Sequence, residues 1–190
     1  TLEQSVAQYW TDHNVSQHIR FGTALDSLEY LEWRNDQYVG YAELMPVWGY
    51  NGQRILDYGC GPGNDLAGFH HFSHPSRLVG VDVSSTSLAQ ARERLKLHGR
   101  NVETVHLPPA ETKLPFEDGS FDLVHCSGVL HHMVDPSVTL REFHRVLRSG
   151  GMAQIMVYNA DSVWMHLYVA WLKMIVENAF PGLDLAAAFR

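Results

Sequence analysis

The sequence has few cysteines and no surplus of basic residues, and both features narrow the class of protein. Its two cysteines, Cys60 and Cys126, lie far apart and outside any paired or metal-spaced motif. A disulfide scaffold is therefore not indicated, and a reduced, cytoplasmic protein is expected. The 14 Lys and Arg residues against 21 Asp and Glu give a formal net charge of -7. This charge argues against nucleic acid as a partner held by the overall field.

Long apolar runs are also missing. The most apolar stretch, residues 163–176, contains His166 and Lys173 and is shorter than the ~18 to 20 residues that span a bilayer. It is expected to form a buried helix or a lid on the substrate side, with an oligomer contact as the alternative. The chain does not open on a signal-like basic and apolar segment, so neither membrane nor export is indicated. It begins at Thr1 rather than Met, and its natural start is expected to be missing.

What the sequence does contain is a change of pattern near Gly52. Before it, aromatic and apolar residues recur at helical spacing, which predicts two or three helices. After it, short apolar runs alternate with amphipathic stretches, as in a parallel sheet with crossover helices. The predicted strands are 54–58, 77–83, 102–107, 121–127 and 152–158, and the predicted helices between them are 65–72, 85–97 and 136–147.

Local signals mark the ends of these helices. Ser84 or Ser85 is suited to cap the second helix, and Asp135 precedes Pro136 at the start of the third. The pair Gly150-Gly151 is expected to end the third helix and to reopen the chain into a strand.

The strongest functional signal is an apolar strand that ends in Asp57 and is followed by Gly59, Gly61 and Gly63. Such glycines let the backbone turn tightly and let a ligand approach closer than a Cβ would permit. A nicotinamide dinucleotide fingerprint needs Gly-x-Gly-x-x-Gly, but the sixth position counted from Gly59 is Asn64. An NAD-dependent oxidoreductase is therefore the weaker alternative.

The acidic residue and the three glycines resemble the first motif of the class I S-adenosylmethionine-dependent methyltransferases. This resemblance implies that Asp57 helps to orient the amino group of the methyl donor. It also implies that the backbone of Gly59, Cys60, Gly61 and Gly63 wraps the donor's methionine part.

A second carboxylate, Asp82, ends the next buried-type strand, where open α/β sheets place their ligands. A carboxylate at this point can accept hydrogen bonds from two ribose hydroxyls. The resemblance assigns that role to Asp82 and places Val83 against the adenine, with a helix-capping or solvated Asp as the alternative.

Two further stretches resemble later motifs of the family. Before Leu114 the family often has an acidic and then a small residue that reach the adenine; here the order is reversed, as Ala110-Glu111. With this reversal, a backbone contact of Glu111 to the adenine is expected rather than a side-chain contact. Near Ser127, the family's fourth motif closes its backbone over the methionine part.

His131 and His132 follow that motif and face the expected substrate space. Either is a candidate general base, because histidine titrates near neutral pH, although packed or solvated histidines are the alternative. No third ligand stands at a recognised metal spacing beside them, so a metal is not expected. The same holds for three other clustered histidines, His70, His71 and His74.

The four motifs cover roughly residues 54–159. The resemblance implies an α/β fold with a Rossmann-like, doubly wound, mostly parallel sheet in the order 3-2-1-4-5, preceded by N-terminal helices. The expected segments are a helical lid or substrate segment 1–52, a donor-binding core 53–160 and a C-terminal helical segment 161–190. Two final strands of the family are not found, so the chain is expected to be truncated, with an exposed sheet edge or residues 163–176 open to a second copy.

The function implied is direct transfer of a methyl group from S-adenosylmethionine to an unidentified small-molecule acceptor, leaving S-adenosylhomocysteine. The sulfonium already activates the methyl group, so the protein mainly aligns the acceptor and excludes water. A donor-binding regulatory module and a spermidine-synthase-like enzyme are the alternatives within the fold. The acceptor pocket is expected to draw on Tyr9, Trp10, His13, Leu130 to His132, Tyr158 and Asn159.

Overall fold

A computed structural model of the chain describes residues 2–13, 19–109, 111–159, 162–163 and 166–184. The chain divides into two units, residues 1–156 and residues 157–190. All five strands of the described ranges belong to the first unit, which also carries the described donor-site residues proposed from the sequence.

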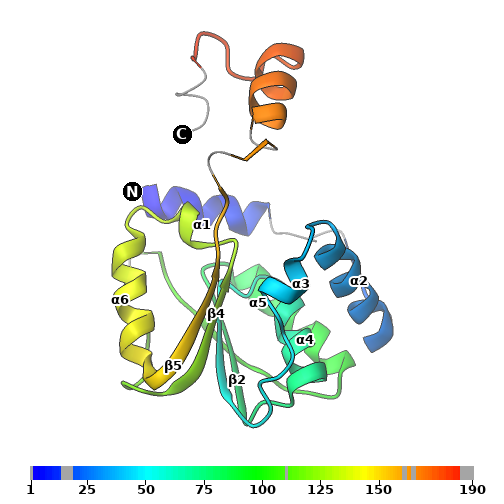
Figure 1. Ribbon diagram of the computed structural model, residues 1–190, viewed down its shortest axis with the longest axis vertical. Coiled ribbons are helices and arrows are strands. Elements are labelled where there is room, and N and C mark those ends of the chain that lie inside the picture. The colour runs from blue at the N-terminus through cyan, green and yellow to red at the C-terminus, as the bar shows by residue number, and fades with distance from the viewer. Residues whose placement is uncertain (1, 14–18, 110, 160–161, 164–165, 185–190) are drawn as a thin grey trace. The chain divides into compact units, whose positions relative to one another are not determined.

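The first unit is built on a five-stranded parallel sheet in the order β3-β2-β1-β4-β5 (Figure 1). This order confirms the doubly wound fold expected from the sequence. The winding direction reverses between β1 and β4, which is the point where open α/β sheets bind their ligands. The strands are β1 (Arg54–Tyr58), β2 (Arg77–Asp82), β3 (Glu103–His106), β4 (Phe121–Ser127) and β5 (Leu147–Met156).

Helices cover both faces of the sheet. Helices α4 and α5 lie on one face and α6 on the other, and α2 packs on α4 (Figure 1). The expectation of two or three N-terminal helices is confirmed with three, and the three crossover helices are confirmed with ends that differ from the prediction by at most one residue. Their bounds are α1 (Leu2–Asp12), α2 (Ala24–Asp36), α3 (Tyr41–Leu44), α4 (Asn64–Ser73), α5 (Ser85–Leu97) and α6 (Pro136–Val146), with a short 3-10 helix η1 (Leu130–His132).

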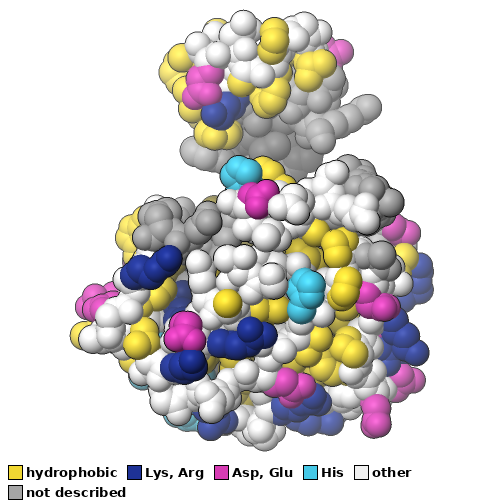
Figure 2. Space-filling model, turned by 180° about the vertical axis from the view of Figure 1, so that it is seen from behind, with side chains coloured by type: hydrophobic (Ala, Val, Ile, Leu, Met, Phe, Trp, Pro, Cys, Tyr) yellow, Lys and Arg dark blue, Asp and Glu magenta, His cyan; other side chains and the backbone are white. Residues whose placement is uncertain are grey.

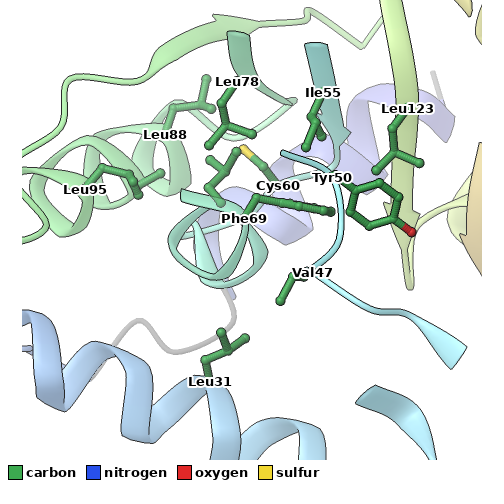
Figure 3. Close-up of a cluster of buried hydrophobic side chains, with 12 residues drawn as sticks. Leu31, Val47, Tyr50, Ile55, Cys60, Phe69, Leu78, Leu88, Leu95 and Leu123 are labelled. Atoms are coloured by element: carbon green, nitrogen blue, oxygen red, sulfur yellow. The ribbon is translucent and has the colours of Figure 1, made fainter. Parts of the chain in front are cut away.

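The core has two halves, because alternate residues of each strand point to opposite faces. Ile55 of β1 packs with Leu66 and Phe69 of α4, in the half that also receives Leu31 from α2 (Figure 3). Leu56, the next residue of β1, packs in the other half, against α6 and the segment before β4. Parallel strands buried on both faces explain the nearly continuous apolar runs in the sequence.

The helix starts were predicted correctly, but the role of Gly150-Gly151 was not. Ser84 caps α5, since its hydroxyl accepts a hydrogen bond from the backbone of Ser87, and Asp135 caps α6 in the same way. Helix α6, however, ends at Val146, and both glycines lie inside β5. Gly150 has a φ of 73°, and the register with β4 shifts nearby. The glycines therefore mark a bulge in the strand, which the sequence does not distinguish from a helix stop.

The second unit contains a π-helix, His166–Val176, inside the stretch 163–176 for which a helix was predicted. An ion pair between Lys173 and Glu177, 2.6 Å apart, joins its last turn to the following residue. None of the helices in the described ranges is both long and apolar enough to cross a bilayer.

Candidate functional site

A glycine turn follows β1 at the carboxyl edge of the sheet. Gly59, Gly61 and Gly63 have φ angles of 74°, 51° and 82°, a region that side chains other than glycine rarely enter. The backbone N–H of Gly59 donates to the Val81 carbonyl over 2.7 Å, which holds the turn against β2. A Cβ on Gly59 would lie 2.3 Å from Cγ2 of Val129. Both the backbone conformation and the packing therefore require glycine here.

Asp82 at the end of β2 contacts this turn directly. Its Oδ2 accepts a hydrogen bond from the backbone N–H of Gly61 and its Oδ1 one from Ser84, each over 2.8 Å. Burial raises the pKa of Asp82, whereas these two donors favour its ionised form. Each carboxylate oxygen can accept a further hydrogen bond. Asp82 thus joins the glycine turn to α5 and retains acceptor capacity for a ligand.

Asp57 at the end of β1 is a buried carboxyl with an unused acceptor. Its side chain is almost wholly enclosed, and its Oδ2 has no hydrogen-bond partner among the described residues. Burial raises the pKa of Asp57 to about 7. Buried polar atoms are normally paired, so an orphaned oxygen at the carboxyl edge of the sheet is a position for a ligand's donor group.

A buried polar network lies beside Asp57. His125 of β4 pairs with Asp57 in the sheet register, and its Nε2 lies 3.4 Å from Oδ2 of Asp65 in α4. Asp65 also forms an ion pair with Arg34 of α2. Burial raises the pKa of Asp65, but the charges of Arg34 and His125 outweigh it and hold the pKa below its usual range. Burial lowers the pKa of His125, but the carboxylates of Asp65 and Asp57 outweigh burial and raise that pKa.

Ser127 at the end of β4 is held by the N-terminal segment. Its Oγ lies 2.5 Å from the hydroxyl of Tyr41 in α3, and that hydroxyl accepts a hydrogen bond from Arg34 over 3.4 Å. Burial raises the pKa of Tyr41 to about 12, so its hydroxyl stays protonated at neutral pH. Ser127 is therefore connected to Arg34 through Tyr41.

His131 and His132 lie in η1, close to α1. The ring of His132 meets Trp10 edge-on, with centroids 4.9 Å apart, and both border a cavity of about 440 Å³. Burial lowers the pKa of His131 to about 4 and also lowers that of His132, so both rings are neutral at neutral pH. The cavity is lined by Ser5, Val6, Tyr9, Trp10 and His132.

Other residues that were expected around the acceptor or the adenine make different contacts or belong to the second unit. His13 stacks on Tyr9 and does not line that cavity, whereas Tyr158 and Asn159 belong to the second unit. The carbonyl oxygen of Val83 lies 2.9 Å from Nε2 of His106, and the carboxylate of Glu111 accepts from the backbone of Lys113.

Ala110 lies outside the described residues, but its neighbour Glu111 borders a larger cavity of about 790 Å³. Other residues lining that cavity are His106 and Leu107 at the end of β3, Phe116, and Arg145 of α6. Cys60, within the glycine turn, is buried, and burial raises the pKa of its thiol. Cys60 therefore offers a ligand its backbone rather than a thiolate.

Sequence reasoning missed Asp65, His125 and the roles of Arg34 and Tyr41. His125 sits in an apolar strand and gives no motif, and Arg34 is 31 residues from its partner Asp65. The alternation of side chains along β4 was a usable signal. His125 comes two residues after Leu123 and therefore lies on the same buried face of the strand. A buried histidine requires a polar partner on the adjoining elements.

Comparison with known proteins identifies the family. Residues 56–155 match the methyltransferase-domain family. A demethylmenaquinone methyltransferase from Geobacillus stearothermophilus is 30% identical over 203 residues, which cover 93% of this chain and 83% of that protein. An uncharacterised protein from a Streptomyces fradiae transposon is 41% identical over 145 residues, covering 73% of this chain and 36% of that protein.

Solved structures agree with this relationship. A structure from Bacillus halodurans that is assigned as a methyltransferase superposes with a TM-score of 0.57 at 27% identity, covering 70% of this chain and 57% of that one. The chain belongs to the class I S-adenosylmethionine-dependent methyltransferases, which confirms the resemblance drawn from its motifs. It spans between 25% and 41% of the length of the first four curated relatives that it matches.

Proposed function

We propose that this chain binds S-adenosylmethionine at the carboxyl edge of β1 and β2 and transfers its methyl group to a small-molecule acceptor. The observation that carries the proposal is the pair of strand-end carboxylates, Asp57 and Asp82, on either side of a turn with three glycines in the left-handed region. Asp57 would supply a negative charge for the ammonium group of the donor, and Asp82 would supply acceptors for its ribose hydroxyls.

The residues present fit the two ends of the donor. The unused Oδ2 of Asp57 suits the ammonium of the methionine part, which would lie along the Gly59 to Gly63 backbone and near Ser127. Asp82 would accept the ribose hydroxyls, with the adenine lying toward Val83 and the backbone near Ala110 and Glu111.

The acceptor would enter between α1 and η1, over the carboxyl end of β4 (Figure 1). The cavity there combines the aromatic rings of Tyr9 and Trp10 with the neutral imidazole of His132. When bound, the donor supplies an electrophilic methyl group on its sulfonium. The protein's contribution is to hold the acceptor in line with it, and His132, with His131 beside it, is suited to accept the acceptor's proton.

A small acceptor also agrees with the surface charge. Figure 2 shows one face of the molecule, on which Lys and Arg side chains alternate with Asp and Glu side chains. A polyanionic acceptor is bound more favourably by a continuous basic surface. The Geobacillus relative is named for methylation of demethylmenaquinone, a small molecule, which makes quinol-like compounds reasonable members of a first acceptor panel.

Methyl transfer is tested with a donor labelled in its methyl group and a panel of small aromatic and quinol acceptors. We expect labelled product from at least one acceptor. Trp10→Ala and His132→Ala should lower kcat/KM by about 10- to 100-fold and leave donor affinity unchanged, because they alter only acceptor placement and proton transfer.

Matched controls are Trp48→Ala and His144→Ala, whose side chains are exposed and do not line that cavity. Full activity of both cavity variants would show that the acceptor binds elsewhere. Donor binding without product from any acceptor would favour a regulatory module, the alternative that keeps the donor site but not the transfer.

The affinity for S-adenosylhomocysteine should depend on pH through Asp57. Its pKa is raised to about 7 by burial, and the ligand's ammonium favours the ionised carboxylate. Affinity should therefore rise by nearly tenfold per pH unit from about pH 5.5 and level off near about pH 7.5. Calorimetric titrations across this range measure the profile. An Asp57→Asn variant should bind weakly with a flat profile, and a flat profile in the unmodified chain would remove Asp57 from the proposed site.

A further inference from the structure

The N-terminal segment before the matched residues 56–155 reaches the donor site through Tyr41, which contacts Ser127, and through the cation Arg34. Arg34 of α2 donates from Nη1 to Oδ2 of Asp65 over 3.3 Å, and from Nη2 to the other carboxylate oxygen. Its guanidinium also lies 5.1 Å from the centre of the Tyr41 ring. The side chains of Arg34 and Asp65 are only 19% and 11% exposed. A buried ion pair of this kind is weak evidence for stability, because desolvation offsets its attraction. Its position therefore suggests another role.

Asp65 connects this cation to the proposed donor site. It lies in the first turn of α4, directly after the glycine turn, and its Oδ2 is 3.4 Å from Nε2 of His125. His125 is fully buried and lies beside Asp57 in the sheet register, and its Nδ1 is 3.4 Å from the side-chain oxygen of Gln154. A polar path thus runs from α2 to the carboxyl whose Oδ2 is orphaned.

The charges along this path balance only when Arg34 is present. Asp57 and Asp65 are two buried carboxylates, and the cations of this path are Arg34 from α2 and His125 from β4. Arg94 of α5 also acts on Asp65, but its guanidinium donates to Ser27 and Asn64. Without Arg34, His125 would be the one cation of this path for two carboxylates, and one carboxyl would take up a proton. Asp65, whose Oδ2 lies 3.4 Å from Nε2 of His125, would keep its charge, so Asp57 would be the one that becomes neutral. The other titratable groups near Asp57 are Tyr41, Cys60, Asp82 and Cys126, which supply no positive charge.

We propose that Arg34 is a positioning residue of the donor site, which keeps Asp57 ionised for the ammonium of the donor by neutralising Asp65 and leaving His125 as the counter-charge of Asp57. Together with Tyr41 it also fixes Ser127. The inference rests on the proposed function, and it extends the donor site into α2 and α3. It concerns only the amino-acid end of the donor, because Arg34 has no contact with Asp82, which serves the ribose.

Because the effect of Arg34 is expected only at the amino-acid end of the donor, two ligands can test it. S-adenosylhomocysteine carries the amino-acid end, whereas 5'-methylthioadenosine keeps the adenosine and the sulfur but lacks it. Calorimetry of the whole chain should show that Arg34→Met weakens S-adenosylhomocysteine by about 10-fold or more and changes 5'-methylthioadenosine by less than about twofold. Arg34→Lys, which keeps the charge, should recover most of the loss. Arg141→Met in α6, an exposed arginine outside the network, is the matched control.

Charge balance makes a second, independent prediction. Arg34→Met should move the midpoint of the pH profile for S-adenosylhomocysteine upward by about one unit, and adding Asp65→Asn should return it, because one cation then faces one carboxylate again. Equal weakening of both ligands by Arg34→Met, or no weakening of either, would overturn the inference, as would a midpoint that Asp65→Asn fails to return. If the unmodified chain binds neither ligand, the proposed function fails and the inference with it. If it binds both and Arg34→Met changes nothing, the inference alone fails.

Discussion

Replacing Asp82 with Asn is expected to lower the affinity for S-adenosylmethionine and S-adenosylhomocysteine by about 100-fold, because hydrogen bonds to a charged acceptor contribute about 1.5–3 kcal/mol each. The amide keeps one acceptor oxygen and replaces the other with a donor. That donor would face the N–H of Gly61 or of Ser84, both of which the carboxylate now accepts. The variant thus loses acceptors for the ribose and loosens the glycine turn at once.

Calorimetric titration gives the affinity, and thermal unfolding separates binding from loss of fold. Asp135→Asn is the matched control, since Asp135 also precedes a helix and accepts a backbone N–H, and Asn caps helices as well as Asp does. A folded Asp82→Asn protein that binds the donor as tightly as the unmodified chain would place the ribose elsewhere.

Gly59→Ala is expected to have the largest effect on stability among the variants considered. The left-handed backbone alone costs a non-glycine residue about 1–2 kcal/mol. The new Cβ would also lie 2.3 Å from Cγ2 of Val129, and overpacking of this kind costs about 1–3 kcal/mol more. We expect the free energy of unfolding in urea to fall by about 2–5 kcal/mol, and donor affinity to fall with it, because relief of the clash shifts the backbone on both sides of the site.

Gly52→Ala separates the two causes. Gly52 has a φ of 71°, but an added Cβ there would meet nothing within 4 Å, so only the conformational cost applies. Adding Val129→Ala to Gly59→Ala removes the clashing methyl groups and should recover part of both stability and affinity. If Gly59→Ala and Gly52→Ala destabilise equally, close packing against Val129 is not part of the site.

Most of the fold could be predicted because its signals are local. Strands β1, β2 and β4 are short apolar runs, and the starts of α5 and α6 carry capping residues whose side chains make the expected contacts, Ser84 and Asp135. The exception, Gly150-Gly151, depends on the register between β4 and β5. That register is set by pairing across the sheet and leaves no mark in the nearby sequence.

The residues of the candidate site also fall into a group set by local sequence and a group set by tertiary packing. Asp57, the glycines and Asp82 come from strand ends that the fold must bring to one edge, and a motif sufficed to propose them. Arg34, Asp65 and His125 meet only after α2 has packed on α4 and α4 on the sheet. Their partners are set by tertiary packing, so composition and spacing could not pair them.

The most direct test of the account is a crystal structure of the chain with S-adenosylhomocysteine. The account predicts the ribose hydroxyls within hydrogen-bond distance of the Asp82 carboxylate and the ammonium at Oδ2 of Asp57, over the Gly59 to Gly63 backbone. Ligand density away from both carboxylates, for example in the cavity beside Trp10 and His132, would contradict it.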